Sequence, residues 1–228
     1  MTEIYKNGVV ILDFGSQYTK LIARRVREQN VYSIIMPPNT NLDSILYYKP
    51  SAIILSGGPS SVYEKNAPVF DYAILETNVP VLGICYGMQI LTKFYGGEII
   101  SSIEGEYGST KIDIKINNDI FAGVQSSKVW MSHGDQVSKI PEGWKVSAYS
   151  SNGIVAAMVS QEQKIVATQF HPEVHHTQEG EQMIKNFLFK IASCVANWTP
   201  GNFIEEQVIK IKNLVKKGKV LTGVSGGV

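Results

Sequence analysis

The chain has 228 residues, 44% hydrophobic and 18% charged, and this ordinary globular composition excludes a disordered protein. A formal net charge of +1 gives no global electrostatic attraction to nucleic acid or to an anionic membrane. No apolar run approaches the roughly 20 residues of a membrane span, and the N-terminus lacks the apolar core of a signal peptide. Two cysteines far apart in the sequence do not make a disulfide framework, so we expect a cytoplasmic protein with reduced thiols.

The first half of the chain alternates apolar runs with amphipathic stretches. Strands are predicted over residues 9–14, 32–36, 52–55 and 79–84, and helices over about 15–28, 41–49 and 69–76. Strands that are apolar along their whole length favour a parallel sheet covered on both faces. This order predicts an α/β fold of three layers, with a mostly parallel central sheet and flanking helices.

The pattern changes after about Gly97. Residues 111–116 (KIDIKI) alternate between apolar and polar side chains, which is typical of a half-exposed strand. Further strands are predicted over 129–131, 145–149, 154–159 and 164–170, and a helix over about 178–196. We interpret these strands as mainly antiparallel or mixed, extending the first sheet.

A domain boundary is predicted at Trp198-Thr-Pro-Gly201. Residues 203–217 then form an amphipathic pattern, and 219–224 form a strand pattern that leads into Ser225, Gly226, Gly227 and Val228. This order is that of the start of another α/β domain, and the segment is too short to bury a core. We therefore expect one domain over 1–197, and over 198–228 a linker, a helix and the first strand and loop of a truncated second domain.

The strongest local signal is the run from Val81 to Gln89, VLGICYGMQ. A strand enters Gly83-Ile-Cys85-Tyr-Gly87 and a helix follows, which is the elbow that exposes a nucleophile, with Cys in place of Ser. A thiol near a helix N-terminus is favoured as thiolate, and the N–H of Tyr86 is placed to stabilise an oxyanion. For the elbow alone, a buried structural cysteine is an equally good interpretation.

A second motif changes that balance. His171-Pro-Glu173 lies at the end of a predicted strand, where parallel strands present their loops to a site. In extended backbone, residues two apart share a face, so His171 and Glu173 are expected to point the same way. Together with Cys85 they make the nucleophile, base and orienting carboxylate of a covalent acyl-transfer enzyme.

A metal site is the alternative for this region, because His171, Glu173, His175 and His176 lie within six residues. Histidine and carboxylate suit zinc, but a structural zinc site needs four ligands, and the remaining His133 has no cysteine at metal-site spacing. We therefore expect no metal, and we place His175 and His176 in a solvated loop or beside the catalytic groups.

Two further loops follow predicted strands. Ser56-Gly-Gly-Pro59 brings backbone N–H groups to the sheet edge, where they suit a phosphate or an oxyanion. Ser132-His133-Gly134-Asp135 offers polar groups for a small charged substrate. Each motif alone is weak, since both are also common in ordinary turns.

Taken together, these motifs resemble the class I (triad-type) glutamine amidotransferases. The Gly83–Gly87 and His171–Glu173 motifs occur in that family's order, and Ser56-Gly-Gly-Pro59 and Gln89 match as well. The resemblance covers nearly all of residues 8–192 and implies a flavodoxin-like α/β fold.

The resemblance also implies a role for each matching residue. Cys85 would attack the glutamine carboxamide and form a thioester, His171 would shuttle the proton, and Glu173 would orient His171. The backbone of Gly58 and Tyr86 would hold the oxyanion. The residues that would bind the amino-acid end of glutamine are Gln89, Ser132, His133 and Asp135.

Within that family, three stretches resemble the amidotransferase part of GMP synthetases: Leu12–Arg27, Met131–Asp135 and His171–Thr177. The end of the chain, Ser225-Gly-Gly-Val228, resembles the start of the pyrophosphatase-type ATP loop Ser-Gly-Gly-Val-Asp-Ser, which grips pyrophosphate through backbone N–H groups. In those enzymes ATP adenylylates xanthosine monophosphate (XMP), and ammonia from the first domain displaces AMP to give GMP.

The implied partners are therefore glutamine and a synthetase domain, with XMP and ATP acting through that domain. ATP and magnesium would belong to the synthetase domain, no cofactor is expected in this chain, and the full-length protein is expected to be a homodimer. Neither nucleic acid nor membrane is expected as a partner.

Two rival interpretations remain. Amidotransferase domains also serve anthranilate, CTP and carbamoyl phosphate synthesis, but the Ser-Gly-Gly loop belongs to a different type of synthetase. A reactive-cysteine sensor or binding module would also use a cysteine beside a histidine. The amino-acid-binding set argues against it, because a sensor needs no such pocket.

Overall fold

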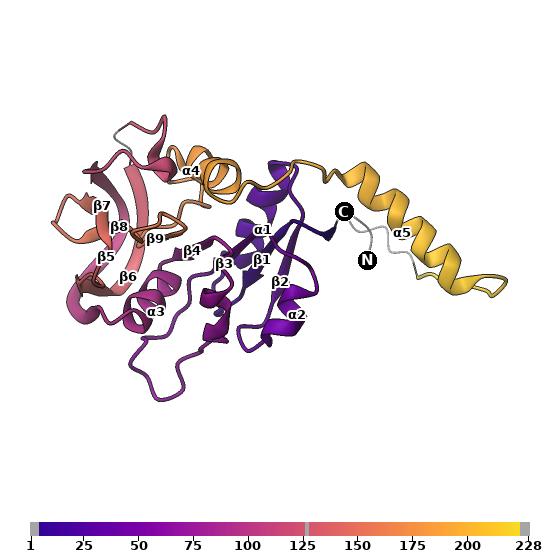
Figure 1. Ribbon diagram of the computed structural model, residues 1–228, viewed down its shortest axis with the longest axis horizontal. Helices are drawn as coiled ribbons and strands as arrows, with labels where there is room; N and C mark the ends of the chain where they lie inside the picture. Colours follow the sequence, from indigo (N-terminus) through magenta and orange to yellow (C-terminus); the bar gives the residue numbers. More distant parts are fainter. Residues whose placement is uncertain (1–4, 126–127, 224–228) are drawn as a thin grey trace.

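The computed structural model describes residues 5–125 and 128–223, which are arranged around a nine-stranded sheet (Figure 1). In chain order the elements are β1 (Val9–Leu12), α1 (Thr19–Glu28), β2 (Ser33–Met36), α2 (Leu42–Leu46), β3 (Ala52–Leu55), the 3-10 helix η2 (Tyr72–Glu76), β4 (Val81–Ile84), α3 (Tyr86–Phe94), β5 (Glu98–Ile114), the 3-10 helix η3 (Asp119–Phe121), β6 (Lys128–Lys139), β7 (Lys145–Ser150), β8 (Val155–Val159), β9 (Ile165–Thr168), α4 (Gly180–Asn186), the π-helical turn η4 (Phe187–Ile191) and α5 (Pro200–Val215).

The strand order across the sheet is β2-β1-β3-β4-β9-β8-β7-β5-β6. Strands β2, β1, β3, β4 and β9 are parallel, while β8, β7, β5 and β6 continue the sheet in antiparallel pairings. The predicted parallel core with an antiparallel extension is confirmed. Because β9 lies between β4 and β8, the ends of two strands far apart in the sequence become neighbours at one sheet edge.

The central strands are apolar throughout because both faces of the sheet are covered. In β1, Val9 and Ile11 join the core beneath α1 and α4, whereas Val10 and Leu12 join the core beneath α2, η2 and α3. Successive strand residues point to opposite faces, so a fully apolar strand supplies both cores at once. The three predicted layers are therefore present (Figure 1).

Strands β5 and β6 are much longer than the patterns in residues 111–116 and 129–131 predict. They form an antiparallel ribbon in which Glu106 pairs with His133 and Tyr107 with Ser132. The segment Ser132–Asp135, interpreted from sequence as a loop after a strand, is thus part of β6. Its polar residues are held in extended conformation by the β5 ladder, a long-range partner that local composition does not reveal.

The C-terminal elements differ from prediction at their ends. The predicted helix over 178–196 stops earlier, because α4 passes into the turn η4 and Ser193 adopts a φ of 50°. Helix α5 begins with a capping box between Thr199 and Asn202, contains no buried residue, and projects away from the sheet (Figure 1).

Residues 219–223 are not a strand, so the prediction of a strand over 219–224 is wrong for the part that the structure describes. Its last residue, Val224, and the loop residues Ser225, Gly226, Gly227 and Val228 lie outside the described residues. Within residues 5–125 and 128–223, no helix combines the length and apolar character that crossing a membrane requires.

Candidate active site

Cys85 occupies the sharp turn between β4 and α3. Its backbone has φ 51° and ψ −101°, a region that side-chain-bearing residues rarely adopt, and its N–H donates to Thr168 O of β9 at 2.7 Å. The turn is tight enough to need glycine at Gly87, where a Cβ would lie 2.4 Å from Leu55 O. The structure therefore forms the strand–turn–helix elbow predicted from sequence, with the thiol at the N-terminus of α3.

His171 and Glu173 lie in the turn that follows β9. His171 Nδ1 and Glu173 Oε1 are 2.7 Å apart, and both side chains are buried. The backbone of His171 is fixed on both sides, since its N–H donates to Trp130 O and its carbonyl accepts from the Thr177 hydroxyl. The pairing of His171 with Glu173 was predicted, but the reason given for it was wrong. A turn, rather than the alternation of side chains along an extended strand, brings the two side chains together.

The surroundings of His171 favour its charged form. Burial alone would lower the pKa, but the Glu173 carboxylate and the hydrogen bond with the Cys85 thiol outweigh burial and raise the pKa of His171 to about 10. The second oxygen of Glu173, Oε2, is buried without a hydrogen-bond partner among the described residues. The carboxylate therefore depends on His171 for its stabilisation, and a protonated His171 beside the thiol is the partner that a thiolate requires.

Three contacts from other elements fix this pair. The ring of Tyr18, just before α1, meets the His171 ring edge-on with centroids 5.2 Å apart. On the same helix, Arg25 Nε donates to Glu173 O at 3.0 Å. A Cβ on Gly57 would lie 3.0 Å from His171 Cε1, so the imidazole lies directly against this glycine.

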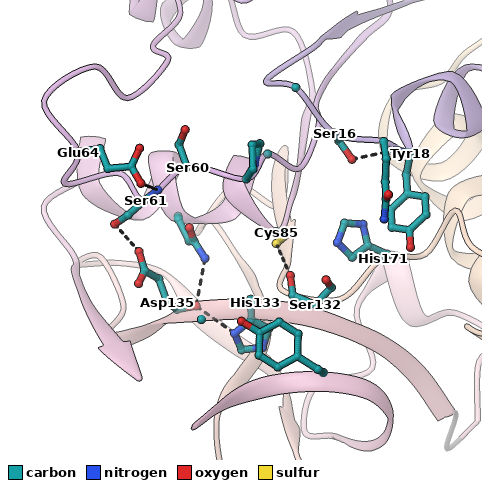
Figure 2. Close-up of a pocket in the computed structure, with 17 residues that line it drawn as sticks. Ser16, Tyr18, Ser60, Ser61, Glu64, Cys85, Ser132, His133, Asp135 and His171 are labelled. Atoms are coloured by element: carbon teal, nitrogen blue, oxygen red, sulfur yellow. Dashed lines mark hydrogen bonds between the residues drawn. The ribbon is translucent and has the colours of Figure 1, made fainter. Parts of the chain in front are cut away.

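The sulfur of Cys85 has two further neighbours. It lies 3.7 Å from Ser132 O, and the buried side chain of Gln169 donates to it from Nε2 at 3.7 Å. Figure 2 shows the thiol and the His171 ring in one pocket with Ser132 beside them. The second cysteine, Cys194, is buried elsewhere, and burial raises the pKa of its thiol to about 12.

These groups share a cavity of about 500 Å³, which suits a small molecule (Figure 2). It is lined by Gly15, Ser16, Gln17, Tyr18, Gly58, Pro59, Ser60, Ser61, Glu64, Cys85, Gln89, Tyr107, Ser132, His133, Gly134, Asp135 and His171. Besides Cys85, six of the site residues predicted from sequence line this cavity. The fold therefore brings together motifs that are far apart in the sequence, as expected.

Of the amino-acid-binding residues predicted from sequence, Gln89 and His133 both contact the backbone carbonyl of Asp135. Gln89 Nε2 donates to Asp135 O at 3.1 Å, and Ser61 Oγ donates to Asp135 Oδ2 at 2.5 Å. His133 is buried, with Nδ1 3.0 Å from Asp135 O, so its ring faces the β6 backbone as well as the pocket. The Asp135 carboxylate lies at the far end of the pocket from the His171 side (Figure 2).

The predicted oxyanion residues occupy different surroundings. Tyr86 follows Cys85 directly at the start of α3, and its side chain is turned away, donating its hydroxyl to Pro68 O at 2.7 Å. Burial raises the pKa of Tyr86 to about 12, so the phenol stays neutral. Gly58 lines the pocket, while a Cβ on its neighbour Gly57 would lie 3.6 Å from Cys85 Cβ.

His175 and His176 are exposed, and the ring of His176 lies against Trp130 with centroids 4.5 Å apart. In the described part of the chain, no group of three or more His, Cys, Asp or Glu residues has the arrangement of a metal site.

Comparison with known proteins agrees with this geometry. The model of the family "Glutamine amidotransferase class-I" matches residues 10–191, which include the elbow and the His171–Glu173 turn. The chain belongs to the class I glutamine amidotransferases.

Several members of this family are similar over most of the chain. A protein named GMP synthase [glutamine-hydrolyzing] from Caldicellulosiruptor saccharolyticus is 49% identical over 221 residues, which cover 96% of this chain and 43% of that protein. Its namesake from Brachyspira hyodysenteriae is 50% identical with the same coverage. The chain thus spans less than half the length of these relatives.

Solved structures give the same fold. A crystal structure from Thermoplasma acidophilum, described as that of a GMP synthase component, has a TM-score of 0.73 and 29% identity, covering 89% of this chain and 98% of that one. A glutamine amidotransferase from Thermotoga maritima, at 22% identity, has a TM-score of 0.61 over 92% of this chain and 90% of its own and supports the fold alone.

Four residues at the site were missed by sequence reasoning. Gly57, Tyr18 and Gln169 lie around Cys85 and His171, and Glu106 lies behind His133. Gly57 is part of Ser56-Gly-Gly-Pro59, Tyr18 is part of Leu12–Arg27, and Gln169 lies two residues before His171, but none of the three was assigned a role from sequence. Glu106 carries no local signal, because its contacts depend on which strands become neighbours.

Proposed function

We propose that this chain hydrolyses glutamine, with Cys85 as the nucleophile, His171 as the base and Glu173 as the residue that orients it. The observation that carries the proposal is one pocket lined by both a thiol at a helix N-terminus and the ring of His171, which is paired with the buried Glu173. Such an arrangement suits attack on an uncharged carbonyl group.

The proposed reaction has two steps. The Cys85 sulfur attacks the carboxamide carbon, His171 donates a proton to the leaving nitrogen, and the C–N bond breaks to give ammonia and a thioester. Water then loses a proton to His171 and attacks the thioester, which releases glutamate and regenerates the thiolate. Backbone N–H groups of Gly58 and Tyr86 are proposed to hold the oxyanion in both steps.

Glutamine is proposed to lie with its amino-acid end at the β6 side of the pocket. The Asp135 carboxylate suits the substrate ammonium group, and Gln89 and the backbone near Ser132 supply further polar contacts. His133 belongs to the same segment and is proposed to support it. This orientation directs the carboxamide toward Cys85, because the thiol and His171 lie away from the Asp135 carboxylate in the same pocket (Figure 2).

The ammonia is proposed to serve a synthetase domain that converts XMP to GMP with ATP. Support comes from relatives named GMP synthase, of whose length this chain covers 43%. In this proposal residues 1–197 are the amidotransferase domain, and 198–228 are a linker, helix and the beginning of the synthetase domain. A homodimer of the full-length protein remains a prediction from the resemblance.

The test is glutamate release from glutamine by the purified chain, beside a Cys85→Ala control. Release that the control lacks is expected, at a basal rate that rises when the synthetase domain, ATP and XMP are supplied. Equal release of glutamate by both proteins would contradict the role of Cys85 as the nucleophile. If the full-length protein supplied with ATP and XMP releases no glutamate, the glutaminase proposal is wrong.

Alkylation gives a readout that needs no synthetase. Iodoacetamide is expected to modify Cys85 and not Cys194, since burial raises the pKa of the Cys194 thiol to about 12. Mass spectrometry of peptides from the native chain locates the modified thiol. Glutamine is expected to protect Cys85, and an equal rate with and without glutamine would argue against binding at this pocket.

A further inference from the structure

The proposed reaction leaves one buried carboxylate without a role. Glu106, on β5, is buried and lies behind the pocket rather than in it. Its Oε1 accepts from Ser150 Oγ at 2.7 Å and from Asn152 Nδ2 at 2.8 Å, and its Oε2 lies 3.3 Å from His133 Nε2. An apolar side chain would fill this space at no cost in desolvation, so a carboxyl group here needs another explanation.

Glu106 is linked to the substrate pocket through His133. The ring of His133 spans the gap from Glu106 to the β6 backbone, with Nδ1 3.0 Å from Asp135 O. The same carbonyl accepts from Gln89 Nε2 at 3.1 Å. A continuous set of contacts therefore runs from Glu106 through His133 to the residue whose carboxylate faces the substrate.

The contacts of the His133 ring determine how many protons His133 and Glu106 hold together. Both ring nitrogens of His133 face oxygen atoms, so a neutral imidazole beside an ionised carboxylate would leave a lone pair against an oxygen. Two arrangements satisfy every atom: an imidazolium with a carboxylate, or a neutral imidazole with a carboxylic acid. Burial lowers the pKa of His133, against the opposing effect of the Glu106 carboxyl group. In either arrangement Nε2 of His133 contacts Glu106, and Nδ1 carries the proton that is donated to Asp135 O.

We propose that Glu106 is a positioning residue that holds the His133 ring through Nε2, keeps a proton on Nδ1, and thereby holds Asp135 for glutamine. Oε2 of Glu106 faces His133 Nε2, while Oε1 accepts from Ser150 Oγ and Asn152 Nδ2. His133 Nδ1–H then donates to Asp135 O. The kinetic consequence of this inference rests on the proposed glutaminase function. The contacts that join Glu106, His133 and Asp135 do not depend on that function.

The kinetic test compares Glu106→Ala with Glu106→Gln. Alanine leaves His133 Nε2 buried without a partner and frees the ring, so KM for glutamine is expected to rise about tenfold or more, with kcat changed less than about threefold. The carboxamide side chain of Glu106→Gln has the shape of the carboxyl group and can donate to Nε2 while accepting from Ser150 and Asn152. The KM of this variant is therefore expected to stay within about threefold of the parent.

Ser147→Ala is the matched control. Like Ser150, Ser147 is a buried serine of β7, but its hydroxyl accepts from Asn118 Nδ2 at 2.9 Å, away from the pocket. The control is expected to lower stability without changing KM. An unchanged KM in Glu106→Ala, a loss confined to kcat, or a Gln variant as impaired as the Ala variant would each overturn the proposal.

A spectroscopic test is independent of glutamine. The ¹⁵N signals of the His133 ring are expected to show a proton on Nδ1, both in the parent and in Glu106→Gln. An Nδ1 without a proton in the parent would overturn the proposal. If the parent releases no glutamate, this measurement still decides the Glu106–His133 arrangement, so failure of the function and of the inference are separable.

Discussion

The imidazole of His171 lies against Gly57, where an added Cβ would be 3.0 Å from His171 Cε1 and 3.6 Å from Cys85 Cβ. His171 and Cys85, the proposed base and nucleophile, are thus spaced in part by the absence of a side chain in the loop that follows β3. A residue that touches neither the substrate nor the transferred proton can in this way control the alignment of both proposed catalytic groups.

Gly57→Ala is therefore expected to reduce kcat/KM for glutamine about 10- to 100-fold, since small misplacements of reacting groups cost rates of that order. The free energy of unfolding should change by less than about 1 kcal/mol, because only a ring edge must shift. Kinetics and thermal unfolding measure the two effects. Gly87→Ala is the contrast: its Cβ would meet Leu55 O at 2.4 Å, so it should lose roughly 1–3 kcal/mol of stability.

Cys85 is held in strained backbone, with φ 51° and ψ −101°. Replacement by glycine removes the strain, whereas alanine keeps it, and such strain amounts to about 1–3 kcal/mol. Cys85→Gly is expected to unfold at a higher denaturant concentration than Cys85→Ala, although both are inactive. The reverse order of stability would show that the turn is not strained.

The His171–Glu173 pair predicts a pH dependence of stability. The pKa of His171 is raised from 6.5 to about 10, so the folded chain holds a proton that the unfolded chain has lost between these values. The stabilisation from this proton is fully present below pH 6.5 and is lost as the pH rises toward 10. The free energy of unfolding should therefore fall over this range. Glu173→Gln removes the largest favourable cause of the shift, so its decline over this range should be smaller in urea titrations.

Arg25 and Arg24 form a matched pair on α1. Both contact the Glu28 carboxylate, but only Arg25 also donates to Glu173 O, at 3.0 Å. Arg25→Ala is expected to lower kcat for glutamine several-fold by loosening the turn that carries Glu173, with KM little changed. Arg24→Ala should leave both constants unchanged, and equal effects of the two substitutions would mean that Glu28, not Glu173, matters.

The sequence predicted the parallel core well, because strands such as Ala52–Leu55 are apolar throughout and are bounded by turn residues. The antiparallel ribbon was predicted poorly. Strand β5 begins at Glu98 and contains several glycines and serines, and its pairing with β6 along most of its length and with β7 at its end keeps it extended. Local patterns describe residues that bury a face, and they miss strands whose stability comes from a distant partner.

The residues of the candidate site also divide into those with a local sequence signal and those without one. Cys85 and His171 were found because tight turns and catalytic motifs leave local signals. Glu106 was not, since its importance arises only when β5, β6 and β7 bring His133 and Ser150 to it. The set of partners around a buried histidine is a property of such an assembly, and no single stretch of sequence contains it.

The place of β9 between β4 and β8 has a consequence for the way the chain acquires its reactivity. The strand that carries the Cys85 elbow is complete early in the sequence, but its neighbour is made of residues 165–168, near the end of the domain. During synthesis Cys85 therefore emerges long before His171, its proposed base, and pairings between such distant segments are slow to form. The proposed catalytic pair assembles in a late step of folding, so an interrupted chain carries Cys85 without His171.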